Sequence, residues 1–141
     1  MTLLALDVGS KRIGVAVSDP SESFAMPLEV VECTNQRADI ERIVEIARER
    51  EATELVVGDP VRLTGERALA SDKVDRFIAT LGRRFPGKIH LVDERLTTAQ
   101  ATRQLIEADV SRAERKRVVD KLAATLILEN FLTRRRRASH G

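Results

Sequence analysis

The sequence has few of the side chains that build disulfides, zinc sites and aromatic binding surfaces. Its 141 residues include one cysteine, Cys33, so neither an intrachain disulfide nor a cysteine-based zinc site can form. Two histidines, His90 and His140, are too few for zinc chemistry that needs three nitrogen or sulfur ligands. Four Phe and no Tyr or Trp argue against binding single strands by stacking bases on aromatic side chains.

Long hydrophobic runs are also missing. No apolar stretch approaches the roughly 18 residues that cross a bilayer, and the N-terminus lacks the basic start of a signal peptide. We therefore expect a cytoplasmic protein with no membrane partner. The length, with 43% hydrophobic and 33% charged residues, is typical of one globular domain and too apolar for a disordered chain.

Positive charge is concentrated at the C-terminal end. Residues 112–141 carry nine Lys and Arg against three acids, whereas residues 1–111 are net negative. Most of the cations are Arg, whose flat, forked head suits phosphate. A basic end on an acidic body indicates a polyanionic partner, although a solubilising tail on a helix would have the same composition.

The hydrophobic pattern predicts strands first and helices later. We expect strands at residues 3–8, 12–18, 28–33, 54–58 and 89–92, the first three forming an antiparallel meander. Apolar residues at helical spacing predict helices over 36–51, before Pro86, over 98–107 and over 115–132. The order βββ-α-β-α-β-α-α gives one mixed sheet with helices packed on it. This is the α/β, ribonuclease H-like architecture.

Three carboxylates stand out by their positions. Asp7 interrupts the apolar run of the first strand, where an ionised group is costly unless it is paired or bound to metal. Glu94 follows the fifth strand, and Asp120 begins the apolar face of the last helix. Carboxylates that converge at one sheet edge repel one another unless divalent cations lie between them, and oxygen ligands favour Mg²⁺ or Mn²⁺.

Each carboxylate also has a structural interpretation. Asp120 could pair with Lys116, and Glu94 could pair with Arg95 or cap the next helix. Asp59 also follows a strand, but an acid before Pro60 is common in turns, so we leave it out of the metal site.

A turn after the first strand could contact phosphate. Gly9 lets the backbone approach an anion, and Ser10 and Lys11 could bind one, although a hairpin turn alone would also need Gly. Lys11, Arg12 and Arg95 are the cations closest to the predicted carboxylates, and we expect them to hold the scissile phosphate.

Four blocks in order resemble the YqgF/RuvX family of Holliday junction resolvases and pre-16S rRNA nucleases, and the match spans nearly the whole chain. The blocks are Asp7–Asp19, Val57–Pro60 followed by Gly65, Asp93–Thr98, and Asp120–Ala124 leading to Ile127–Leu128. The resemblance implies a catalytic triad of Asp7, Glu94 and Asp120 and metal-dependent phosphodiester hydrolysis. Asp59 departs from the family pattern, which more often has an apolar residue there.

A two-metal mechanism agrees with this chain. Two ions can activate a water and stabilise the leaving oxygen, so no His or Ser nucleophile is required. We expect Asp7 to bridge both ions, with Glu94 and Asp120 each holding one. Residues 1–133 would form a single nuclease domain. Residues 134–141 would be a basic, disordered tail in which Arg134, Arg135, Arg136 and Arg137 bind nucleic acid.

The substrate stays open between structured RNA and branched DNA. The resemblance favours processing of the 5′ end of pre-16S rRNA over cleavage of four-way DNA junctions. Junction cleavage needs two symmetric cuts and hence a homodimer, but no dimer surface can be identified in this sequence. A non-catalytic RNA-binding assembly factor is a further alternative. An actin-like kinase or ATPase is a weaker one, because it would need two such domains.

Overall fold

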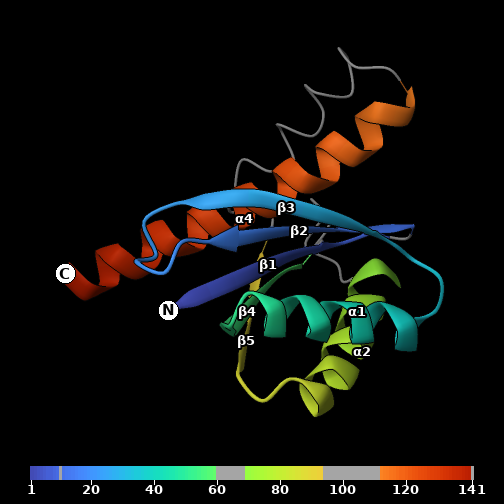
Figure 1. The fold of residues 1–141 in the computed structure, drawn as a ribbon, viewed down its shortest axis with the longest axis horizontal. Coiled ribbons are helices and arrows are strands. Elements are labelled where there is room, and N and C mark those ends of the chain that lie inside the picture. The colour runs from blue at the N-terminus through green and yellow to red at the C-terminus, as the bar shows by residue number, and fades with distance from the viewer. Residues whose placement is uncertain (10, 60–68, 94–111, 141) are drawn as a thin grey trace.

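Five strands form one mixed sheet. The computed structural model describes residues 1–9, 11–59, 69–93 and 112–140, and the strand order is β3-β2-β1-β4-β5 (Figure 1). The strands are β1 Thr2–Val8, β2 Arg12–Ser18, β3 Ala25–Glu32, β4 Ala52–Asp59 and β5 Lys88–Asp93. Strands β1, β2 and β3 pair antiparallel, whereas β4 runs parallel to both β1 and β5. The predicted combination of an antiparallel meander and two parallel strands is confirmed.

Helices cover both faces of this sheet. Within the described residues they are α1 Gln36–Glu49, α2 Leu69–Arg84 and α4 Arg112–His140. Helix α1 begins at Asn35, whose side chain accepts a hydrogen bond from the Ala38 N–H, as is typical of an N-cap. Helices α1 and α2 lie on one face and α4 crosses the other (Figure 1).

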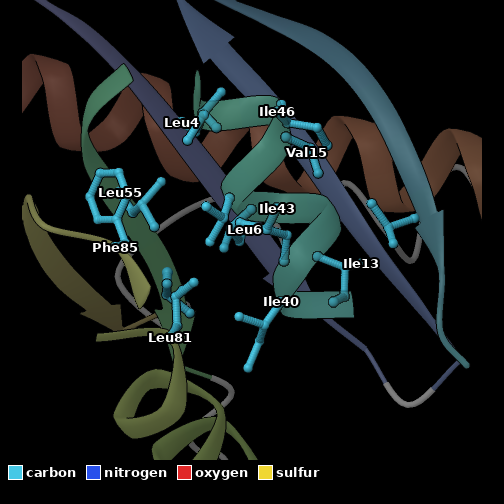
Figure 2. Packing of buried hydrophobic residues seen from close by; sticks show 14 of the residues in the cluster. Leu4, Leu6, Ile13, Val15, Ile40, Ile43, Ile46, Leu55, Leu81 and Phe85 are labelled. Carbon is cyan, nitrogen blue, oxygen red and sulfur yellow. The ribbon is translucent and has the colours of Figure 1, made fainter. Parts of the chain in front are cut away.

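The face under α1 and α2 carries the larger core. Alternation along β1 directs Leu4 and Leu6 to this face, where both are fully buried. Figure 2 shows Ile40, Ile43 and Ile46 of α1 lying over these strand residues. Helix α2 joins the same cluster, so this core fixes both helices on the sheet.

The opposite face of the sheet packs against α4. Leu3 and Ala5 of β1 belong to this second cluster, together with Ala123, Ile127 and Leu128 of the helix. The small side chains on both sides let the helix approach the strands closely. The two residue sets of β1 therefore alternate between two cores, which makes β1 a central, fully covered strand.

The structure differs from two sequence expectations. Strand β3 begins at Ala25, three residues before the predicted start, although Met26 and Pro27 are exposed. Residues 134–140 are not a disordered tail, because α4 continues to His140. The predicted helix over 98–107 lies outside the described residues. In the described ranges no helix combines the length and apolarity needed to cross a membrane.

Strand β3 is an edge of the sheet. Among the described strands only β2 pairs with it, and Pro27 stands opposite Ala16 at the point where the register with β2 shifts. Proline lacks the backbone N–H that a further strand would need and is confined to such edges.

Candidate active site

The carboxyl ends of three parallel strands meet at one edge of the sheet. The last residue pair between β1 and β4 is Leu6 with Val57, and Asp7 is the next residue of β1. Strands β4 and β5 end together at the pair Asp59 and Asp93. Ligand sites in open α/β sheets lie at such an edge, which we call the site edge.

Asp7 is a buried acid at the site edge. Its residue is only 6% exposed, and it pairs with Gly14 of β2. Because side chains alternate along a strand, Asp7 shares the face of Leu3 and Ala5, which is the face covered by α4. A carboxylate in this position fits the oxygen ligand that a divalent cation prefers, since the ion would offset the cost of burying the charge.

Alternation separates Asp7 from two other acids of the site edge. Position 59 follows Leu55 and Val57 by four and two residues along β4, and both of these residues belong to the core under α1. Position 93 follows Ile89 by four residues along β5, and Ile89 packs against that same core. The omission of Asp59 from the metal site stays a prediction, since the structure describes the backbone of positions 59 and 93 and not their side chains.

Asp120 belongs to α4, the helix that packs against the face of β1 that carries Leu3 and Ala5. It precedes Ala123 and Ala124 by three and four residues, and both alanines are buried against the strands. The backbone of α4 is described at position 120, and its side chain is not. Glu94 lies outside the described residues, two positions after Val92, which packs on the α4 side. Among the described side chains no three His, Cys, Asp or Glu form a metal-binding group.

The turn between β1 and β2 depends on a glycine. The Gly9 N–H donates to the Arg12 carbonyl at 2.9 Å, and a Cβ at position 9 would lie 2.7 Å from that oxygen. Lys11 is exposed on this turn, whereas Arg12 pairs with Glu32 of β3, with 3.2 Å between Nε and Oε2. Lys11 is thus presented to solvent beside Asp7, while Arg12 has a partner within the sheet. Ser10 and Arg95, also predicted to bind phosphate, lie outside the described residues.

A second buried acid, Glu54, lies near the start of β4, at the opposite edge of the sheet, where the amino ends of the parallel strands lie. It is 5% exposed and accepts hydrogen bonds from Arg135, and its Oε1 lies 2.8 Å from His90 Nε2. Burial alone would raise the pKa of Glu54, but the hydrogen bonds from Arg135 and His90 outweigh it and hold the pKa below its usual value. Sequence analysis missed Glu54, because it begins the predicted strand 54–58 and no apolar run precedes it.

The C-terminal arginines lie at this opposite edge. Arg135 also lies over the Phe131 ring, 5.5 Å from its centroid, and Arg136 Nη1 donates to the Ser23 carbonyl at 3.1 Å. At 1.5 Å per residue, the 14 residues from Asp120 to Arg134 span about 20 Å. These arginines therefore lie far from the site edge. Two of them, Arg135 and Arg136, contact the body of the protein.

The connection between β2 and β3 is organised by Asp19. Its carboxylate accepts hydrogen bonds from the backbone N–H groups of Phe24, Ser23 and Ser21. These bonds, the Phe24 N–H first and the Ser21 hydroxyl next, lower the pKa of Asp19 to about 2. The loop places Glu22 between the N-terminal amine and Arg135, at 3.6 Å and 3.4 Å.

Comparison with known proteins agrees with this architecture. Residues 1–134 match the family RuvX, described as Holliday junction resolvase. The chain is 47% identical over 133 residues to a protein of Thermoanaerobacter pseudethanolicus named "Putative pre-16S rRNA nuclease", covering 94% of this chain and 96% of the relative. A relative of the same name from Halalkalibacterium halodurans is 44% identical over 136 residues, covering 95% and 97%.

Two solved structures share the fold at low sequence identity. Thermus thermophilus RuvC superposes with a TM-score of 0.54 at 15% identity, covering 90% of this chain and 92% of that one. The fowlpox virus Holliday junction resolvase superposes with a TM-score of 0.56 at 12% identity, covering 94% and 99%. These likenesses confirm the predicted ribonuclease H-like fold.

Proposed function

Because this chain belongs to the RuvX family, we propose that it is a divalent-metal-dependent nuclease that processes the 5′ end of pre-16S rRNA. The nuclease activity follows from the family and from relatives that share more than two-fifths of their residues with it. Metal dependence and the RNA substrate are our proposals. A protein that processes ribosomal RNA would act in the cytoplasm.

The buried position of Asp7 carries the proposal. Asp7 is a buried acid near the end of a central strand, on the face that α4 covers. Asp120 supports the assignment, because α4 packs on that same face and position 120 lies one turn before the buried alanines. We propose that Asp7, Asp120 and Glu94 hold Mg²⁺ or Mn²⁺.

The residues of this chain have separate tasks in that mechanism. When bound, two divalent ions would activate a water and stabilise the leaving oxygen of an in-line displacement. The three carboxylates would position the ions. Lys11, exposed beside Asp7, would hold the scissile phosphate together with Ser10 and Arg95, while Arg12 would first have to exchange its bond to Glu32.

Holliday junction cleavage is the second candidate function. The description of the matched family favours it, and the same carboxylates would serve both reactions. It would need two copies of the chain, one for each cut. A third candidate, RNA binding without catalysis, predicts no metal-dependent hydrolysis.

One substrate panel separates these functions. Purified protein is offered single-stranded RNA, a 5′ fragment of pre-16S rRNA and a four-way DNA junction, each with Mg²⁺ and with Mn²⁺. We expect cleavage of the pre-rRNA fragment that disappears with EDTA. Preferential, paired cutting of the junction would make the second function correct. Binding without hydrolysis in any combination would contradict the nuclease proposal.

A further inference from the structure

A groove between α1 and α2 lies on the face of the sheet that α4 does not cover. Its volume is about 260 Å³, and Ile40 and Thr80 contribute to its lining. The Thr80 hydroxyl lies 3.4 Å from Gln36 Oε1, so the two helices contact each other across the groove. The groove is therefore built by a direct contact between two helices that share a core.

Arginines dominate the charge of this groove. Arg37, Arg83 and Arg84 line it, against one acid, Glu41. Arg84 forms an ion pair with Glu41, which holds its side chain across the gap between the helices. Arg37 and Arg83 are exposed, so their guanidinium groups add positive charge at the rim. Planar guanidinium groups bind phosphate through two parallel hydrogen bonds, which suits a polyanion better than a single small ion.

The beginning of α1 connects the groove to the site edge. The Cys33 N–H donates to the Lys11 carbonyl at 2.9 Å, which ties the turn beside Asp7 to the end of β3. Arg37 follows Cys33 by four residues, in the first turn of α1. The end of β3 thus connects the turn that carries Lys11 to the start of α1, where Arg37 shares the groove with Arg83.

We propose that the substrate nucleic acid passes from the site edge over Lys11 into the α1–α2 groove, where Arg37 and Arg83 bind its backbone phosphates. The proposal rests on the proposed function, because it takes the substrate to be a nucleic acid bound at Asp7. It assigns substrate affinity to a different set of arginines from the C-terminal run. Continuity with the site edge favours nucleic acid over an acidic protein as the occupant.

The test measures binding separately from cleavage. Asp7→Asn serves as the parent, so that a fluorescent 5′ fragment of pre-16S rRNA stays intact during the titration. Anisotropy gives the dissociation constant over a series of KCl concentrations for the parent and for the parent with Arg37→Ala and Arg83→Ala. Two lost phosphate contacts should weaken binding and reduce the salt slope by about 1.4, since each contact to a single strand contributes about 0.7 to the slope.

A matched control removes the same charge from the opposite edge. Arg50, which ends α1, and Lys88, which begins β5, are both exposed there. Arg50→Ala with Lys88→Ala should leave the slope near that of the parent. The proposal would be overturned if the parent and the groove variant had equal salt slopes of binding. It would also be overturned if the groove variant and the control lost equal amounts of affinity and salt slope relative to the parent. It would also be wrong if poly-glutamate bound the parent more tightly than the RNA and lost that binding in the groove variant.

Failure of the function and failure of the groove give different results. If the native chain cleaves no substrate but the groove variant shows the reduced slope, the nuclease proposal is wrong and the groove assignment holds. If the native chain cleaves the RNA and the slope is unchanged, only the groove assignment is wrong.

Discussion

Arg135 donates two hydrogen bonds to the carboxylate of Glu54, with 2.9 Å from Nη1 to Oε2 and 3.2 Å from Nη2 to Oε1. The two residues are 81 positions apart in the chain. Their contact fastens the C-terminal part of α4 to β4, at the edge of the sheet opposite Asp7. The same helix contains Asp120, so the contact helps to fix the position of α4 along the sheet.

Arg135→Met should destabilise the protein by about 2–3 kcal/mol, measured by urea denaturation. Removing one partner of a fully buried pair costs roughly 3–5 kcal/mol, and the smaller figure allows for the partial exposure of Arg135 and for the remaining contact of Glu54 with His90. Arg137→Met, an exposed change on the same helix, is the control and should stay within about 0.5 kcal/mol. Equal losses in both variants would show that the Glu54 contact adds no stability.

Stability should depend on pH through Glu54. The pKa of this carboxyl is lower in the folded chain than its ordinary value, so its contribution is fully present above about pH 5. That contribution disappears as the pH falls and the carboxyl takes up a proton. The difference in unfolding free energy between the native chain and Glu54→Gln should therefore shrink as the pH falls below about 5. A difference that stays constant over this range would contradict the assignment.

Asp19 should titrate at about pH 2, as followed by the chemical shift of its carboxyl carbon in NMR. The N–H of Phe24 and the hydroxyl of Ser21 favour the charged carboxylate, so protonation requires a lower pH than in an open chain. The stabilisation that Asp19 provides is lost as the pH falls through about 2. Titration near the ordinary value of an aspartate would mean that the loop hydrogen bonds are absent in solution.

Asp7→Asn should abolish cleavage and leave the fold intact. Asparagine keeps the shape of the side chain and removes a buried charge, so the free energy of unfolding without metal should stay equal or rise slightly. Circular dichroism and the cleavage assay measure the two effects. Glu129→Gln, an exposed change on α4, is the control and should keep full activity. Normal turnover by the Asp7 variant would exclude Asp7 from the catalytic site.

Millimolar Mn²⁺ or Mg²⁺ should raise the melting temperature of the native chain, because a ligand that binds only the folded state stabilises it. The combined variant Asp7→Asn, Glu94→Gln and Asp120→Asn should show no such shift. Differential scanning calorimetry with and without metal measures both. Equal shifts in the two proteins would place the ion elsewhere.

Local pattern was sufficient for most of the fold. Alternating and continuous apolar runs predicted all five strands and their order along the chain, because each strand buries its own side chains against a helix. The beginning of β3 was missed, since Met26 and Pro27 carry no signal of a buried strand. The helical course of residues 134–140 was also missed. Four consecutive arginines suggest a solvated tail, and the contact of Arg135 with Glu54 depends on residues far away in the sequence.

The same patterns predicted only part of the candidate site. An acid inside an apolar strand predicted that Asp7 would be a buried charge, and the structure confirms that burial. Its role, with those of Glu94 and Asp120, stays a prediction. Glu54 begins its strand and does not interrupt an apolar run, so this argument did not reveal it; its carboxylate pairs with Arg135 and His90. A buried acid in the sequence therefore indicates that a cation is required, and the tertiary structure decides which one.

Pro27 has a consequence for how two copies of this chain could associate. Proline and an irregular register are features that make an edge strand a poor template for further pairing, so extension of the sheet across β3 by a neighbouring molecule is disfavoured. Self-association through this edge, whether into a functional pair or an aggregate, is therefore disfavoured by the backbone itself. Two copies that cut one four-way junction are therefore expected to meet through a surface other than the edge at β3.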